Sequence, residues 1–325
     1  MVKAAWNKAG WFGAGWFGAG WFGAWGPRGF VPGLLLWMCG VVAAGAMPLA
    51  HPEATHPVFR LWQRDPLLLH SASALVIDAR DQRVLFEKNP YTVRPIASLT
   101  KLMMAMVVLD AHQPMNQVIT IRRSDIDTLK WSASRLLPGM RFTRARLLQL
   151  ALMSSENRAA HALARHYPGG VAACVRAMNR KAHSLGMLDT HYVDPTGLWP
   201  GNRSNAHDIA LAVEEAAHYT TIHDDTTDVG TVVHPEGRTL VYRNSDHLLY
   251  AGDWRMLVSK TGFINESGHC LAFEAMLRGR PVVVVLLDSW RPYNDFVDAM
   301  QLRDWLREQS PVQWAEAREG APLLH

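Results

Sequence analysis

Short apolar segments near both ends of the chain predict β-strands. The segments 73–78 and 83–87 flank a polar turn, which predicts a β-hairpin. Toward the C-terminus, apolar runs at 256–259, 270–276 and 281–288 predict three more strands. The last is an almost unbroken run of valine and leucine, typical of a central strand that is buried on both faces. Shorter strands are predicted at 117–121, 231–233 and 238–242.

Helical patterns occupy the middle of the chain and its C-terminal part. The segment 98–110 contains no glycine or proline and is rich in leucine and methionine, which predicts a buried helix that starts near Ser98. Thr143 and Ser155 are predicted to cap the next two helices. A turn is predicted at 194–197, Asp-Pro-Thr-Gly. The helices expected after the first are 144–153, 156–167, 172–185, 206–218 and 294–307.

The order of these elements predicts the fold class. A strand pair comes first, helices fill the middle and antiparallel strands return at the end, so the first and last strands have to pair in one sheet. We therefore expect an α+β fold, with an antiparallel sheet flanked by helices and an all-helical insertion. No linker rich in proline, glycine and serine divides residues 51–325, which we expect to form a single catalytic domain.

The charge of the chain is concentrated in residues 1–50. The whole chain has 33 Lys and Arg against 29 Asp and Glu, a net charge of +4. Residues 1–50 contain three of the basic residues and no acidic ones, so the remainder is close to neutral. The same segment holds six of the 13 tryptophans. The basic balance therefore describes a leader, and it gives no support for a nucleic-acid partner.

The leader has the pattern of an export signal. After Arg28, the apolar stretch 34–46 ends in small residues, which is typical of a secretory signal and predicts a periplasmic protein. An uncleaved anchor that associates with the inner membrane is the alternative. Before this stretch, Gly-Trp-Phe-Gly-Ala repeats every five residues, a period of neither helix nor strand. We interpret the repeat as low-complexity sequence; an interfacial membrane segment and a start site placed too far upstream are the alternatives.

Cysteine and histidine give no sign of a metal site. Cys174 and Cys270 remain after the leader, and their spacing leaves open whether they pair or stay as buried thiols. None of the 15 histidines lies in an H-E-x-x-H pattern. We expect neither a metal nor another cofactor.

Three short motifs carry candidate chemistry, and they occur in a fixed order. S-x-x-K at 98–101 starts the predicted buried helix, S-x-N at 155–157 lies between two predicted helices, and K-T-G at 260–262 ends a predicted strand. In S-x-x-K the i, i+3 spacing places an amine beside a hydroxyl on one helical face. Each motif alone is compatible with a helix cap or a solvated charge. All three together, each in a suitable element, indicate an acyl-serine enzyme.

The motifs resemble those of the serine penicillin-recognising enzymes, in particular the low-molecular-mass D-alanyl-D-alanine peptidases of the D,D-endopeptidase type. The resemblance runs from about residue 73 to 308. Besides the motifs, it includes Arg-Pro-Ile-Ala-Ser at 94–98, Leu-Pro-Gly at 137–139 and Val-Asp-Pro-Thr-Gly-Leu at 193–198. It implies a β-lactamase/transpeptidase-like fold with the site between the sheet and the helical half.

The resemblance implies a role for each motif residue. Ser98 would attack a D-Ala carbonyl and become acylated, Lys101 would act as general base, and Ser155 would relay a proton to the departing amine. Burial and the nearby charge of Lys260 are expected to lower the pKa of Lys101. Glu156 is expected to point outward or to support the loop, without a catalytic role. The substrate-binding residues implied are Asn157 for a substrate amide, Lys260 and Thr261 for the free carboxylate, Gly262 for an open strand edge, and the backbone N–H groups of Ser98 and Phe263 for the oxyanion.

The relatives differ in reaction, and the chain gives some means to choose among them. A class A β-lactamase needs a further Glu for deacylation, and 188–194 contains none, so a penicillin should leave a long-lived acyl group on Ser98. Family carboxypeptidases usually carry a second β-domain and an anchor, whereas here the last strands and helix take up most of the chain after Gly262. We therefore expect an endopeptidase that cleaves D-alanyl-meso-diaminopimelate cross-links, acting on peptidoglycan peptide stems and inhibited covalently by β-lactams. A carboxypeptidase that trims pentapeptide stems, or a non-catalytic wall-binding protein, are the alternatives.

Overall fold

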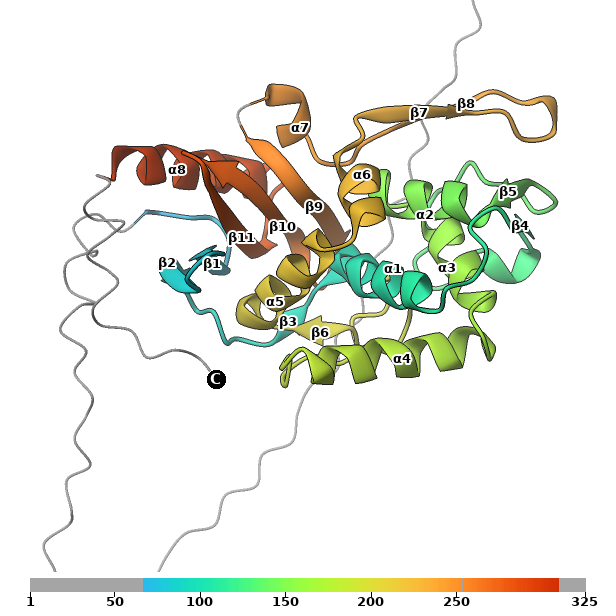
Figure 1. Ribbon diagram of the computed structural model, residues 1–325, viewed down its shortest axis with the longest axis horizontal. Helices are drawn as coiled ribbons and strands as arrows, with labels where there is room; N and C mark the ends of the chain where they lie inside the picture. Colours follow the sequence, from blue (N-terminus) through green and yellow to red (C-terminus); the bar gives the residue numbers. More distant parts are fainter. Residues whose placement is uncertain (1–66, 253, 310–325) are drawn as a thin grey trace, which may run out of the picture. The chain divides into compact units, whose positions relative to one another are not determined.

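A five-stranded antiparallel sheet forms the centre of the structure, a computed structural model that describes residues 67–252 and 254–309. Its strand order is β2-β1-β11-β10-β9 (Figure 1). The pairing of β1 with β11 confirms that the first and last strands share one sheet. The export signal and the aromatic repeat lie outside the described residues. The strands are β1 (Ser73–Asp78), β2 (Arg83–Lys88), β9 (Arg255–Ile264), β10 (Gly268–Leu277) and β11 (Arg280–Ser289).

Both faces of the sheet are covered by apolar packing. On β11, Val283 and Val285 belong to one core together with the helical insertion, and Val282 and Val284 belong to a second core. The second core includes residues of α8 (Asn294–Glu308), which packs on β10 and β11. Alternate side chains of a strand point to opposite faces, so a strand in the middle of the sheet needs apolar residues at every position. The valine run of β11 is therefore explained, and its prediction as a central strand is confirmed.

The helical insertion packs around one buried helix, α1 (Thr100–Asp110). A 3₁₀ turn, η2 (Ala97–Leu99), precedes it, so Ser98 lies just before the regular helix. Nearly every residue of α1 is buried, as its leucine- and methionine-rich sequence predicts. The helices around it are α2 (Arg144–Met153), α3 (Asn157–Arg165), α4 (Gly170–Ser184), α5 (Ala206–Ala217) and α6 (Thr220–Thr227).

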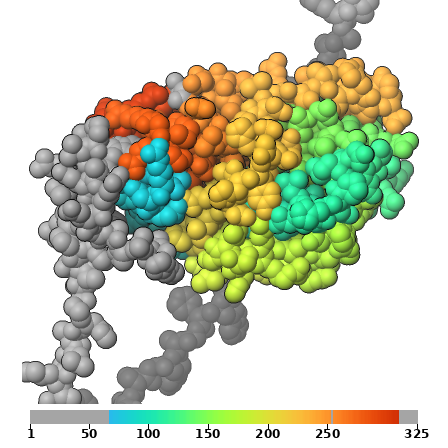
Figure 2. All heavy atoms as spheres, in the orientation of Figure 1, coloured from blue at the N-terminus to red at the C-terminus, as the bar shows by residue number. Residues whose placement is uncertain are grey.

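Small sheets and short helices complete the insertion. The sequence did not indicate α6, because its eight residues bury only Ile222 and Thr226 and show no apolar stripe. In the space-filling view, the yellow to gold segment that includes α5 and α6 lies between the green helical segments and the orange to red strands and α8, and the region of β7 and β8 extends above the green segments (Figure 2). The remaining elements are β3 (Arg94–Pro95), β6 (Arg203–Ser204), β4 (Val118–Thr120), η3 (Arg123–Asp125), β5 (Arg141–Thr143), β7 (Gly230–Val233), η4 (Pro235–Gly237), β8 (Leu240–Arg243) and α7 (Leu248–Ala251).

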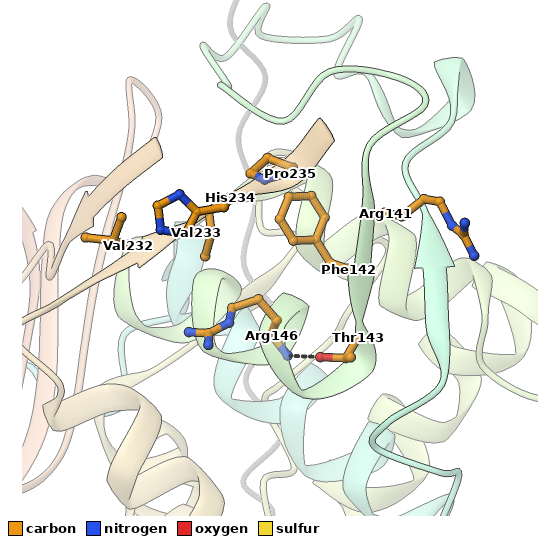
Figure 3. A pocket seen from close by; sticks show the side chains of 8 residues that line it. All are labelled: Arg141, Phe142, Thr143, Arg146, Val232, Val233, His234 and Pro235. Atoms are coloured by element: carbon orange, nitrogen blue, oxygen red, sulfur yellow. Dashed lines mark hydrogen bonds between the residues drawn. The ribbon is translucent and has the colours of Figure 1, made fainter. Parts of the chain in front are cut away.

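The predicted cap of α2 is confirmed, and that of α3 is wrong. Thr143 Oγ1 accepts a hydrogen bond from the backbone N–H of Arg146 at 3.2 Å (Figure 3). The cap of α3 is Glu156, whose carboxylate accepts from the N–H of Arg158 at 3.2 Å. Ser155 instead has a positive φ of 58° and turns the chain between the two helices. A side chain in that left-handed conformation precedes the helix and leaves the capping position to the next residue.

Both cysteines of the described residues are free, and one strand is longer than its sequence predicts. Cys174 and Cys270 are both buried free thiols. The strand predicted at 256–259 continues through the K-T-G motif to Ile264, where it pairs with Gly268 of β10. Lys260 therefore lies within β9 and not at its end. In the part of the chain that the structure describes, no helix is long and apolar enough to cross a membrane.

Candidate active site

A cavity of about 370 Å³ lies where the edge strand β9 approaches the 3₁₀ turn that carries Ser98. Ser98, Ser155 and Asn157 line one wall, and Thr261, Gly262 and Phe263 line the other. The side chains of Lys101 and Lys260 are buried behind these walls. All eight residues expected from the motifs are thus brought to one place. The cavity is also lined by Ser245, His247, His269, Pro292, Tyr293, Asp295 and Phe296.

The Nζ atom of Lys101 contacts three oxygen atoms. It lies 2.7 Å from Ser98 Oγ, 2.8 Å from Asn157 Oδ1 and 2.7 Å from the carbonyl oxygen of Thr196. The S-x-x-K spacing explains the first contact, because it places both side chains on one helical face. Thr196 was not expected to take part, since a backbone carbonyl leaves no signature in the sequence.

Burial gives Lys101 an unusual pKa for a lysine. Loss of hydration disfavours the ammonium form and lowers the pKa of Lys101 to about 7, although the charges of Asp194 and Glu156 raise it. At neutral pH a large fraction of this amine is therefore unprotonated, against about 3 in 10,000 for a solvated lysine. Burial was expected to lower the pKa of Lys101, and the value of about 7 agrees with that expectation.

Lys260 is the second buried lysine of the site. Burial and the positive charge of Lys101 both lower the pKa of Lys260 well below its ordinary value, and only Asp246 opposes them. The repulsion between the two lysines thus lowers the pKa of Lys260, whereas the sequence predicts this effect for Lys101. A bound carboxylate next to Lys260 would favour its charged form again.

Two glycines allow other segments to approach the backbone at Ser98. A Cβ atom on Gly262 would lie 2.9 Å from the backbone nitrogen of Ser98, so the K-T-G glycine is required by this close approach. A Cβ atom on Gly197 would lie 1.9 Å from the carbonyl oxygen of Ala97. Ala97 itself has a positive φ of 45°, a conformation that costs an alanine about 1 kcal/mol. The strained peptide before Ser98 is held between these two neighbours.

The two polar residues of the S-x-N motif, Ser155 and Asn157, differ in their contacts near Ser98. Asn157 is engaged at both ends, because Oδ1 accepts from Lys101 and Nδ2 donates to Ser132 Oγ at 3.0 Å. Ser155 lines the cavity, but it is not among the hydrogen-bond partners of Lys101 in the described part of the chain. A proton relay through Ser155 therefore requires a small rearrangement after substrate binds.

Glu156 is expected from the sequence either to point outward or to support the loop, and in the structure it does not point outward. Its side chain is buried, caps α3 and forms a hydrogen bond with Ser134. Burial raises the pKa of Glu156, and its charge raises that of Lys101. The expected supporting role in the loop is compatible with these contacts.

The turn at 194–197 holds the Thr196 carbonyl against Lys101. Asp194 Oδ1 accepts from the backbone N–H groups of Thr196 at 2.5 Å and Gly197 at 2.8 Å, and Oδ2 accepts from Trp199 at 2.9 Å. The sequence predicted a turn here, and this prediction is confirmed. Its connection with Lys101 was missed, because it depends on where the turn packs.

A polar segment at 244–246 supports β9 next to the K-T-G motif. Ser245 Oγ lies 2.6 Å from Thr261 Oγ1, and the N–H of Ser245 donates to the carbonyl of Met153 at 2.9 Å. Asp246 accepts from Ser259 Oγ at 2.5 Å. These contacts fix the part of β9 that carries Lys260 and Thr261 relative to the end of α2.

A second hollow lacks this chemistry. It lies between the start of α2 and the hairpin β7–β8, and its lining includes no serine or carboxylate (Figure 3). No group of histidine, cysteine, aspartate and glutamate within residues 67–252 and 254–309 could hold a metal ion. The lining of the Figure 3 hollow is Arg141, Phe142, Thr143, Arg146, Val232, Val233, His234 and Pro235.

The fold and the Ser98–Lys101 pair define an acyl-serine peptidase of the penicillin-recognising type. A family model described as D-alanyl-D-alanine carboxypeptidase, peptidase S11, matches residues 62–290. The chain belongs to this family, as its motifs had indicated.

Two relatives carry the name D-alanyl-D-alanine endopeptidase. The protein from Pseudomonas aeruginosa is 46% identical over 241 residues, which cover 73% of this chain and 77% of that protein. The protein from Escherichia coli is 42% identical over 239 residues, with the same coverage of 73% and 77%.

Solved structures show the same fold. The Streptomyces K15 DD-transpeptidase aligns with a TM-score of 0.69 at 24% identity, over 73% of this chain and 97% of that one. A D-alanyl-D-alanine carboxypeptidase from Mycobacterium tuberculosis aligns with a TM-score of 0.65 at 26% identity, over 74% and 92%. The predicted α+β, transpeptidase-like fold class is confirmed.

Proposed function

We propose that Ser98 is the nucleophile and Lys101 the general base of a serine-type D-alanyl-D-alanine peptidase. The observation that carries this proposal is the 2.7 Å contact between Ser98 Oγ and the buried Nζ of Lys101. The Thr196 carbonyl and Asn157 Oδ1 only accept hydrogen bonds, so they take the two N–H bonds of a neutral amine. The lone pair then faces the Ser98 hydroxyl, as a general base requires.

The reaction proceeds through an acyl-enzyme. Ser98 Oγ transfers its proton to Lys101 and forms an ester with the carbonyl carbon of a D-Ala residue. The bond from that carbon to nitrogen breaks, and the departing amine receives a proton through Ser155. A water molecule, deprotonated by Lys101, then hydrolyses the ester and restores Ser98.

The second wall binds the substrate next to the scissile bond. Thr261 and Lys260 hold the free carboxylate of the leaving residue, and Gly262 leaves room for an extended peptide along the edge strand. The backbone N–H groups of Ser98 and Phe263 stabilise the oxyanion. Asn157 orients Lys101 and offers its amide to the substrate when Ser132 moves away.

The substrate proposed is a D-alanyl-meso-diaminopimelate cross-link of peptidoglycan, cleaved as an endopeptidase. The two relatives at 46% and 42% identity are named D-alanyl-D-alanine endopeptidase, which supports the endopeptidase reaction. Carboxypeptidase trimming of pentapeptide stems is the second candidate, supported by the description of the family model and by a Bacillus subtilis relative, 27% identical, named a D-alanyl-D-alanine carboxypeptidase. Both reactions use the same Ser98 ester, so they differ only in the leaving residue.

The setting proposed for this activity is the periplasm, with residues 51–325 as a single exported domain. β-Lactams are proposed to acylate Ser98 and to stay bound, since 188–194 provides no Glu to activate a deacylating water. This slow deacylation separates the enzyme from a β-lactamase. The motif side chains present at the cavity argue against a non-catalytic wall-binding protein.

A direct experiment uses cross-linked dimeric muropeptide and monomeric pentapeptide as substrates for the purified protein. We expect the dimer to be converted to monomers, with a smaller release of D-Ala from the pentapeptide. The Ser98→Ala variant should do neither and should not be labelled by a fluorescent penicillin. Release of D-Ala without dimer cleavage would favour the carboxypeptidase, and labelling that survives Ser98→Ala would exclude the acyl-enzyme mechanism.

A further inference from the structure

The active-site cavity includes a part, lined by the start of α8, that the proposed reaction does not use. Three aromatic side chains, His247, Tyr293 and Phe296, line this part together with Asp295. His247 comes from the segment before α7, and the other three lie at the start of α8. We call these four residues the α8 corner. It is continuous with the cavity that contains Ser98 and Thr261.

The three rings of the α8 corner contact one another. The ring centroid of His247 lies 5.4 Å from that of Tyr293 and 5.4 Å from that of Phe296. Tyr293 and Phe296 are 6.2 Å apart. Tyr293 is 59% exposed at the lip of the cavity. Ring faces and edges of this kind provide an apolar surface for a chain of methylene groups.

Asp295 adds a buried acceptor to this apolar surface. Asp295 is only 2% exposed, and its Oδ1 atom has no hydrogen-bond partner among the described residues. The backbone N–H groups of Asp295 and Phe296 lie near the carboxylate and lower its pKa, but burial and the charges of Asp246 and Asp298 raise it to about 6. A buried carboxylate oxygen without a donor is costly, so it is suited to an N–H group of a bound ligand.

Tyr293 holds an unfavourable backbone conformation at this position. Its φ is 67°, in the left-handed region, and it occupies the N-cap of α8 without a side-chain capping bond. Asparagine, aspartate or serine would be better caps, and glycine would relieve the φ. Strain of this kind collects at ligand sites, where the side chain has a use that offsets it.

We propose that the α8 corner binds the side chain of the residue that leaves Ser98, and that it selects a long diamino acid over D-alanine. The proposal rests on the proposed function, in which Thr261 and Lys260 hold the carboxylate of that residue. A side chain that starts beside Thr261 passes the rings of His247, Tyr293 and Phe296, and a nitrogen at its far end donates a hydrogen bond to Asp295. The methyl group of D-alanine is too short to reach these groups.

The test uses the reverse of the leaving step, which does not need cross-linked substrate. An N-acyl-D-alanyl thioester first acylates Ser98 and releases its thiol. An added amine then competes with water: its nitrogen forms an amide with the acyl carbon, the bond from that carbon to Ser98 Oγ breaks, and Oγ regains a proton. The acceptors compared are meso-diaminopimelic acid and D-alanine at equal concentration, and the measured quantity is the ratio of the two amide products.

We expect the unmodified protein to form the diaminopimelate product about tenfold in excess, the effect of one charged hydrogen bond and the ring contacts. Asp295→Asn and Tyr293→Ala should bring the ratio toward one. Tyr91→Ala is the matched control, since Tyr91 is also 58% exposed and pairs with His207 at 5.3 Å away from the cavity lining. Its ratio should equal that of the unmodified protein.

The product ratio does not depend on the fraction of folded protein, so a partly unfolded variant still reports on the corner. A ratio near one in the unmodified protein, or a ratio that neither variant changes, would overturn the proposal while leaving the peptidase intact. Failure of the thioester and of a fluorescent penicillin to acylate Ser98 would instead remove the proposed function and the corner's role with it.

Discussion

The two walls of the cavity are built in opposite ways. On the helical wall, the polar groups are bonded to one another, because Ser98, Asn157 and the Thr196 carbonyl all meet at Lys101. On the strand wall, the hydroxyl of Thr261 contacts that of Ser245, and both residues line the cavity. The first wall is ready for proton transfer before substrate arrives, and the second is ready to receive a ligand.

This difference reflects the two tasks of the site. A general base has to be oriented and kept unprotonated, which neighbouring acceptors and burial achieve. A binding wall has to direct its donors toward the substrate, so its support should come from neighbours that donate to the same groups. Variants of the helical wall should therefore lower the rate of acylation, and variants of the strand wall should mainly weaken substrate binding.

The largest effect is expected at the centre of the helical wall. Lys101→Met removes the base and should lower the second-order rate of penicillin acylation by about 10³-fold or more. The variant also leaves the Thr196 carbonyl and Asn157 Oδ1 without their donor, so its free energy of unfolding should fall by about 1–3 kcal/mol, and the rate is measured well below its melting temperature. Lys88→Met is the control, since Lys88 donates to the carbonyls of Leu69 and Ser71 and does not line the cavity. A fall of less than tenfold for Lys101→Met would show that another group takes the proton.

A second large effect is expected where the two walls touch. Gly262→Ala introduces a Cβ atom 2.9 Å from the Ser98 nitrogen and should displace one donor of the oxyanion hole, with a loss of about 10²-fold in acylation rate. In the control Gly201→Ala, the new Cβ meets a side-chain methyl group of Val193 at 3.0 Å and no backbone atom, so the rate should change little. Equal rates for the two variants would mean that β9 does not approach Ser98 as closely as described.

The pH dependence tests the state of Lys101. Because only the neutral amine can accept the proton and its pKa is about 7, the acylation rate should rise tenfold per pH unit below pH 7 and level off above it. Glu156→Gln removes a charge that raises the pKa of Lys101, so the midpoint should move to lower pH by less than about one unit. A midpoint that moves to higher pH in this variant would contradict the arrangement around Lys101.

The smallest effect is expected on the strand wall. A substrate carboxylate only accepts hydrogen bonds, so Thr261 must donate to it and Ser245 must then donate to Thr261. Ser245→Ala should raise KM by about three- to tenfold with little change in kcat. Ser245→Thr keeps the hydroxyl and should restore KM, and the exposed Ser184→Ala is a control away from the cavity. A loss confined to kcat would place Ser245 with the helical wall.

The sequence predicted the sheet and its pairing because they depend on local patterns. The valine run of β11 and the hairpin of β1 and β2 follow from which residues fit a buried strand. Likewise, α1 follows from its uninterrupted apolar residues. α6 and the length of β9 could not be predicted, because few apolar residues mark α6 and the hairpin with β10 extends β9.

Some residues of the candidate site could likewise be predicted from the sequence, and others could not. The spacing of the three motifs pointed to Ser98, Lys101, Ser155, Asn157 and Lys260. Resemblance to a family then supplied the role expected of each residue. No role was predicted for Ser245 or for the Thr196 carbonyl, because a hydroxyl or a backbone oxygen acquires its role only from the groups beside it.

The sequence by itself determined the class of fold, the order of its strands along the chain and the side chains able to carry acyl transfer. Only the tertiary structure decided that burial lowers the pKa of Lys101 to about 7, and that the start of α8 lines the same cavity as Thr261. The physical reason is that burial, electrostatic interaction and the shape of a cavity depend on distances between segments far apart in the chain. Local patterning carries no record of those distances.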